Sequence, residues 1–320
     1  MIRLFTAELR RLLARRITLW TTVAAFLMLL VIAGTAWYGS QPLNAAQTAA
    51  NQAAYQEALD QWKIDGPQQV KDCEAEKGPA SGAQPPVDCS ILAPRPEWFR
   101  ATPHNISEFT NSTPMGVTHG VGLVSLLIAA SFVGAEFTSG SISTWLLVEP
   151  RRTRVFASKV AAVGLMSTVA MVVALPLTLV CWWVVGMLND FSFALEPGLM
   201  TALLQQSGRA ILLVPAAAMA AAGLAFALRS AAPTFVTIGL WLMAGLWFMT
   251  NSHLGWMSLA GNLEAWVVGQ STYSFNQCAP HGCTYVQRTI DLDQGGLYCF
   301  GLCLASILVG WTSFLRRDVN

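Results

Sequence analysis

The chain has 320 residues, of which 54% are hydrophobic and only 12% are charged, and its formal net charge is +1. An ordinary soluble domain carries about 25% charged residues, so a soluble protein of this length could not bury so much apolar surface. The lack of a strong basic character argues against nucleic acid as a partner. We therefore predict an integral membrane protein.

Residues 1–16 combine an apolar face with arginines on the opposite face, which predicts an amphipathic helix at the membrane interface. Anionic lipid headgroups would favour such a helix on the inner leaflet. A signal peptide is the alternative, but the apolar stretch that follows is longer than a signal core of about 7–15 residues. The apolar face comprises Ile2, Phe5, Leu9, Leu12 and Leu13.

Six later runs are apolar and long enough to cross a bilayer, which takes about 17–25 residues as a helix. Each must be helical, because lipid offers no hydrogen-bond partner to loose backbone groups. The predicted fold is thus all-α, with a six-helix transmembrane domain in residues 17–320. The runs are 17–38, 115–135, 160–187, 207–228, 233–250 and 295–315.

The basic residues predict the orientation of these spans. Twelve of the nineteen fall on one set of short segments, if the N-terminus is cytoplasmic. Because an excess of Lys and Arg marks cytoplasmic loops, we expect a multi-pass protein of the cell membrane with both termini in the cytoplasm.

Two long external segments are predicted, at 39–114 and 251–294. In the first, the Ala- and Gln-rich stretch 43–62 predicts a helix that ends at Gly66-Pro67, and 78–86 is flexible or extended. In the second, 254–269 predicts short helices before the last span.

Four cysteines lie in these external segments, and their even number indicates two disulfides. Sequence neighbours would pair Cys73 with Cys89 and Cys278 with Cys283, although four cysteines allow three pairings. A metal site at Cys278, His281 and Cys283 is the alternative. Three ligands within six residues and no clear fourth do not make a zinc site, so we predict no metal.

The loop 136–159, between the second and third predicted spans, is the most distinctive local pattern. Proline ends a helix at or before the preceding residue, so Pro150 predicts one short amphipathic helix over 141–149. Cations at the end of that helix suit the negative end of its dipole. The alternative is an ordinary positive-inside loop. The cations are Arg151, Arg152, Arg154 and Lys159.

Motifs of known chemistry are missing from the sequence. It contains no Walker-type G-x-x-x-x-G-K-[ST], no H-E-x-x-H and no G-x-S-x-G, so we predict that the chain is not an enzyme. The spans hold almost no ionisable residues, which argues against an ion-driven carrier. Weakly polar or apolar groups would then line any pathway, although packing against lipid is an alternative role for each of them. The candidates are Trp241, Met243, Trp247 and Phe248.

Taken together, the N-terminal amphipathic helix, six spans, Gly134-Ala135-Glu136 and the short helix before Pro150 resemble the permease subunits of type-two ATP-binding-cassette (ABC) exporters. The resemblance covers the whole chain in topology but only 134–159 in sequence. It implies a dimeric pathway formed with a second copy or a sister permease, and a separate ATPase subunit that holds ATP and Mg. It also implies that the loop contacts this ATPase through Glu136, Ser141, Trp145, Leu146, Leu147, Glu149, Arg151, Arg152 and Arg154.

A second class of function fits the same sequence. The chain could be a non-transporting anchor, a sensor, or a subunit that transmits force to a partner through the large external loop 39–114.

Overall fold

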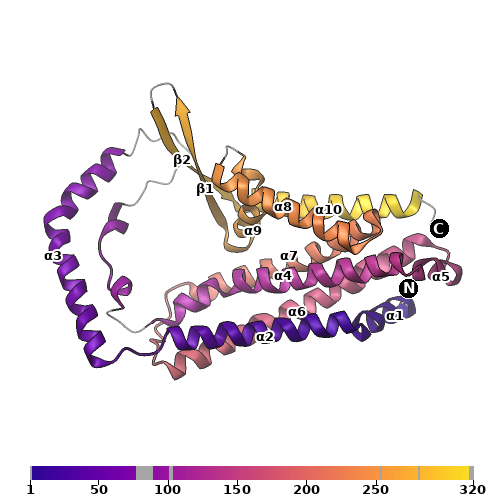
Figure 1. Ribbon diagram of the computed structural model, residues 1–320, viewed down its shortest axis with the longest axis horizontal. Helices are drawn as coiled ribbons and strands as arrows, with labels where there is room; N and C mark the ends of the chain where they lie inside the picture. Colours follow the sequence, from indigo (N-terminus) through magenta and orange to yellow (C-terminus); the bar gives the residue numbers. More distant parts are fainter. Residues whose placement is uncertain (1, 77–88, 101–103, 252–253, 280–281, 317–320) are drawn as a thin grey trace. The chain divides into compact units, whose positions relative to one another are not determined.

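The computed structural model describes residues 2–76, 89–100, 104–251, 254–279 and 282–316. Within these residues, five helices are long and apolar enough to cross a membrane (Figure 1). Each contains or closely matches one of the predicted apolar runs, which is the pattern of a multi-pass membrane protein. The five are α2 (Arg16–Gly39), α4 (Ile106–Thr138), α6 (Arg152–Leu188), α7 (Leu199–Leu228) and α10 (Leu292–Arg316).

Helix α8 (Ala231–Asn251) covers the remaining predicted span, 233–250. Its apolar described stretch, Ala231–Gly245, is shorter than the other five spans. That α8 crosses the membrane, which would bring the number of spans to six, therefore stays a prediction.

The chain divides into two compact units. Unit 1 comprises Met1–Val31, Asn111–Leu179 and Met200–Asn320, and unit 2 comprises Ile32–Thr110 and Val180–Leu199. Helix α7 is the most deeply packed span, with 56% of its most apolar window buried, whereas only 6% of that window is buried in α2. The surface of α2 is apolar and therefore suits contact with lipid.

The core of unit 1 has an aromatic centre at Phe226 of α7. The Phe226 ring lies 4.7 Å from the ring of Phe156, 4.9 Å from that of Phe314 and 5.7 Å from that of Phe137. These rings come from α6, α10 and α4, so the contacts tie the ends of four helices together. Leu12 of α1 (Ile2–Ala14) and Ile142 belong to the same cluster of buried side chains.

In unit 2, helix α3 (Ala45–Glu76) is packed against two short 3-10 turns, η1 (Cys89–Leu92) and η2 (Pro96–Phe99). A disulfide joins Cys73 to Cys89 across a Cα–Cα distance of 6.1 Å. The rings of Tyr55 and Phe99 lie 5.8 Å apart. The predicted Cys73–Cys89 pairing is thus confirmed.

The predicted end of this helix at Gly66-Pro67 is wrong, because α3 continues to Glu76 with Pro67 inside it. An interior proline costs about 3 kcal/mol, chiefly through a lost backbone hydrogen bond and a clash. Side-chain contacts flank it, from Lys63 Nζ to Asp60 at 2.7 Å and from Gln68 to Asp72 at 2.8 Å, and the disulfide holds the far end of the helix. The predicted flexible stretch 78–86 lies outside the described residues.

The segment before the last span contains the predicted short helices, η3 (Gly255–Met257) and α9 (Leu259–Val268). A β-hairpin follows that we did not predict, with β1 (Gln270–Ala279) antiparallel to β2 (Gly282–Asp291). Ser271, Tyr273 and Phe275 are buried at alternate positions of β1, as expected for a strand with one covered face. The spans are helical as predicted, but the all-α description does not hold for this segment.

The hairpin register places Cys278 directly opposite Cys283. The side chains of these two residues lie outside the described part of the structure. The second disulfide stays a prediction.

Candidate functional site

The short helix α5 (Ser141–Val148) lies where the sequence predicts it, between α4 and α6. It begins after Gly140, whose φ of 67° is left-handed and therefore favours glycine. It ends at Val148 and is followed by Glu149, which is extended and precedes Pro150. A glycine turn and a proline stop thus confine one amphipathic element to eight residues.

Helix α5 has one anchored face and one exposed end. Ile142 is 1% exposed in the core of unit 1, and Leu146 packs partly against the same core. Leu147 and Val148, in contrast, are 86% and 76% exposed. The helix therefore presents two apolar side chains that no described part of the chain covers.

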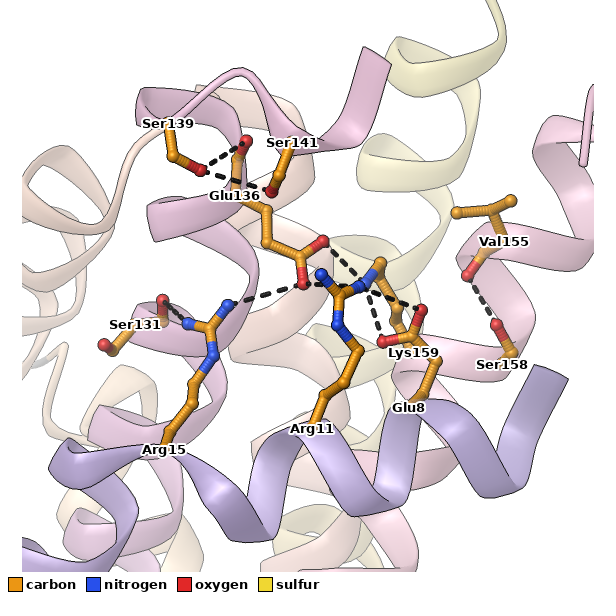
Figure 2. Close-up of polar contacts among 10 residues, drawn as sticks. All are labelled: Glu8, Arg11, Arg15, Ser131, Glu136, Ser139, Ser141, Val155, Ser158 and Lys159. Atoms are coloured by element: carbon orange, nitrogen blue, oxygen red, sulfur yellow. Dashed lines mark hydrogen bonds and ion pairs between the residues drawn. The ribbon is translucent and has the colours of Figure 1, made fainter. Parts of the chain in front are cut away.

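A cluster of buried charges lies beside α5, at the end of unit 1 where α4 stops and α6 begins (Figure 2). Its centre is Lys159 of α6, whose ammonium lies 2.8 Å from a Glu8 carboxylate oxygen and 2.6 Å from one of Glu136. The side chains of Lys159 and Glu8 are 0% exposed and that of Glu136 is 1% exposed. Three helices, α1, α4 and α6, thus meet in one ion cluster.

Two arginines complete the cluster from the side of α1. The Arg15 guanidinium lies 3.4 Å from Glu136 Oε1 and donates to the Ser131 carbonyl at 3.3 Å. The Arg11 guanidinium lies 3.6 Å from the same Glu136 oxygen and 4.0 Å from Glu8. Burial lowers the pKa of Arg15, with a smaller contribution from Arg11, whereas the Glu136 and Glu8 carboxylates act in the opposite direction.

Aromatic rings extend the cluster to α5. Phe132, buried in α4, lies 4.8 Å from the Arg15 guanidinium and 5.0 Å from the Lys159 ammonium. The Arg11 guanidinium lies 4.8 Å from the ring of Trp145 on α5. Because a cation over an aromatic face is attracted by the ring quadrupole, Arg11 links the ion cluster to α5.

In the Gly134-Ala135-Glu136 motif, the first and the last residue each have a structural role. A Cβ on Gly134 would overlap the backbone of Ala231 at the start of α8, so only glycine permits this close approach of α4 and α8. Glu136 follows one half-turn later and enters the ion cluster. The motif therefore joins a close helix contact to a buried carboxylate.

The buried charges stabilise this corner only as a set. Two carboxylates face three cations, so each buried charge has a partner of opposite sign. Removing one partner of a buried pair typically costs about 3–5 kcal/mol, because the other charge stays buried without compensation.

The remaining predicted contact residues separate into two groups. Ser141 lies near Ser139, with their hydroxyl oxygens 3.2 Å apart, and Glu149 lies 3.7 Å from Arg154. Arg151 is exposed. Arg152, in contrast, is directed to the C-terminus of α10.

Arg152 donates to the carbonyls of Phe314 and Leu315 at 3.2 and 3.5 Å. These are among the last carbonyls of α10, which have no partner within the helix. Arg152 therefore caps α10 within unit 1.

The four predicted pathway residues all lie on α8, and Trp241, Met243 and Trp247 are exposed. Their role in lining a pathway stays a prediction. Within the described part of the chain, no group of three His, Cys, Asp or Glu residues could hold a metal ion.

Sequence reasoning missed the role of Glu8 and the depth of Lys159. It placed the arginines of 1–16 on the face opposite the apolar one but gave them no partner in the protein, whereas Arg11 and Arg15 point toward Glu136. The local signal is Glu8, which is followed three and seven residues later by Arg11 and Arg15 in a segment otherwise rich in basic residues. No local pattern pairs Glu8 with a lysine 151 residues away.

Comparison of the chain with protein-family models and with curated protein sequences gives no match.

Proposed function

We propose that the chain is the membrane-spanning permease subunit of an ATP-driven ABC exporter, and that α5 docks on a separate ATPase subunit. The observation that carries the proposal is the exposed apolar end of α5, Leu147 and Val148. A short helix with one anchored face and one exposed apolar end suits insertion into a groove of a partner.

The anchoring of α5 also suits this role. Ile142 is buried in the core of unit 1 and Trp145 contacts Arg11, so a push on α5 would be passed to α1 and, through the ion cluster, to α4 and α6. In this proposal α5 faces the cytoplasm, and the partner ATPase holds ATP and Mg. The pathway itself forms between two permease copies or between this chain and a sister permease.

The test is a single substitution in the exposed end of α5. We expect Leu147→Asp to abolish co-purification with the ATPase, because a carboxylate would be buried in an apolar contact without a partner. The matched control is Thr144→Asp, which adds the same charge at an exposed polar position of the same helix. Pull-down of the intact complex, with the ATPase identified by mass spectrometry, measures the effect. Equal recovery of the ATPase with both variants would contradict the docking role of Leu147.

A force-transmitting or anchoring subunit is the second candidate, and unit 2 favours it. Its long helix α3 is tied to η1 by a disulfide, and Ile64 and Trp98 are exposed on this segment. Such a segment could bind a partner outside the membrane. ATPase activity of the reconstituted complex that rises with an exported substrate would favour the permease. Activity that responds only to a protein bound to 39–114 would favour force transmission.

A further inference from the structure

Lys159 makes the shortest ionic contacts of the cluster, and it makes them with two different helices. Its ammonium forms ion pairs with Glu136 at the end of α4 and with Glu8 in the middle of α1. The other ion pair described for Glu8 is with Arg11, at 4.0 Å, which belongs to the same helix. In the described part of the chain, only Lys159 therefore joins the Glu8 carboxylate to another helix.

Loss of the Lys159 charge would affect the two carboxylates differently. Glu136 would keep both arginines, at 3.4 and 3.6 Å. Among the described residues, Glu8 would keep Arg11 at 4.0 Å and a weaker electrostatic interaction with Arg15, while its carboxylate stays fully buried. Because an uncompensated buried carboxylate is strongly unfavourable, α1 would move until Glu8 reaches water.

Movement of α1 would reach α5 by two contacts. Arg11 lies between Glu136 and the Trp145 ring, so it leaves Trp145 when α1 moves. Leu12 of α1 and Ile142 of α5 belong to one buried apolar cluster. Displacement of Leu12 together with α1 therefore opens the core against which α5 packs.

We infer that Lys159 is a positioning residue for α5, and that it acts through α1. Its ion pair with Glu8 fixes the position of α1. Helix α1 in turn contacts Trp145 of α5 through Arg11 and shares a buried apolar cluster with Ile142. The inference rests on the proposed function for one point, that the purpose of α5 is to contact an ATPase. Helix α1 is then part of the docking apparatus as well as a helix at the membrane surface.

Thiol labelling of the full-length protein in lipid nanodiscs tests the inference without any partner. Leu12→Cys and Ile142→Cys place reporter thiols at positions that are 0% and 1% exposed. Leu13→Cys, at a neighbouring position that is 51% exposed, is the matched control. Peptide-resolved mass spectrometry separates these thiols from the native cysteines.

We expect Lys159→Gln to raise the maleimide labelling rate of both Leu12→Cys and Ile142→Cys by at least roughly ten-fold, and to leave Leu13→Cys unchanged. Protection of both buried positions in Lys159→Gln would overturn the inference. Exposure of Leu12→Cys alone would also overturn it, because α5 would then be positioned without α1.

A rescue variant separates loss of charge balance from general misfolding. Adding Glu8→Gln to Lys159→Gln removes the uncompensated carboxylate, so we expect labelling to fall back most of the way to the original rate. A double variant as reactive as the single variant would contradict the electrostatic mechanism. Since no ATPase is present, failure of the docking proposal leaves these results unaffected, and the Leu147→Asp pull-down tests that proposal separately.

Discussion

Two Lys–carboxylate pairs in this protein have nearly the same length and different surroundings. Lys159 lies 2.8 Å from Glu8 with both side chains 0% exposed, whereas Lys63 lies 2.7 Å from Asp60 with side chains 73% and 69% exposed. The first pair joins residues far apart in sequence, and the second lies within one helix. Burial, rather than distance, decides what such a pair contributes, since water screens the exposed one.

The two pairs also belong to segments that are held in different ways. Helix α1 is held in unit 1 by buried ions and by Leu12. Helix α3 is held in unit 2 by a disulfide and by the contact of Tyr55 with Phe99. An ion cluster can be rearranged by a change in charge or position, whereas a disulfide is permanent until it is reduced. The corner around α5 is therefore the better suited of the two to movement.

The largest expected effect is at the buried pair. Lys159→Gln should lower the free energy of unfolding by about 3–5 kcal/mol, because Glu8 loses its closest cation and α1 gives up buried contacts when Glu8 moves to water. Unfolding of the full-length protein in mixed detergent, followed by circular dichroism, measures the change. A loss of under about 1 kcal/mol, typical of an exposed pair, would show that water already screens this cluster.

Removal of the disulfide should have the next largest effect, and it should be local. In the chain-entropy model a loop of about 15 residues contributes roughly 3 kcal/mol, so Cys73→Ser with Cys89→Ser should free η1 and η2 from α3. Limited proteolysis of residues 89–100 reports the change. The control is Cys181→Ser, which removes a cysteine that forms no disulfide. Unchanged proteolysis in the double variant would mean that noncovalent contacts suffice to hold this segment.

A smaller effect is expected at the end of α10. Arg152→Ala should destabilise unit 1 by about 1–2 kcal/mol, because the last carbonyls of α10 lose a charged donor. The neighbouring Arg151→Ala removes an equal charge from an exposed position and should change stability by less than about 0.5 kcal/mol. The same unfolding measurement applied to both variants tests the difference. Equal losses would indicate that the effect comes from overall charge and not from the cap.

The smallest effect is expected at the exposed pair. Lys63→Gln should cost about 0.2–0.5 kcal/mol at most, and salt should reduce the difference further. Measurement of α3 stability at low and high ionic strength, in parallel with Lys159→Gln, completes the comparison. A loss at Lys63 as large as that at Lys159 would refute the assignment of the difference to burial.

Local signals in the sequence were sufficient for several elements. Apolar length predicted five spans that the structure contains, and Gly140 with Pro150 bracketed α5 to within one residue. Proximity in sequence predicted the Cys73–Cys89 disulfide. At Pro67 the same kind of reasoning failed, because tertiary and covalent contacts outweighed a local stop signal. The alternation of Tyr273 and Phe275 with polar neighbours in the sequence was a usable signal for a strand that we did not apply.

What the sequence by itself determined is the membrane class, most of the spans and the position of α5, since bilayer thickness and backbone geometry act on consecutive residues. What only the tertiary structure decided is the meeting of Glu8, Glu136 and Lys159 and the contact of Arg11 with Trp145. Glu8 and Lys159 read in sequence as ordinary charges near a membrane surface. Burial gives them their importance, and burial depends on how helices from distant parts of the chain pack together.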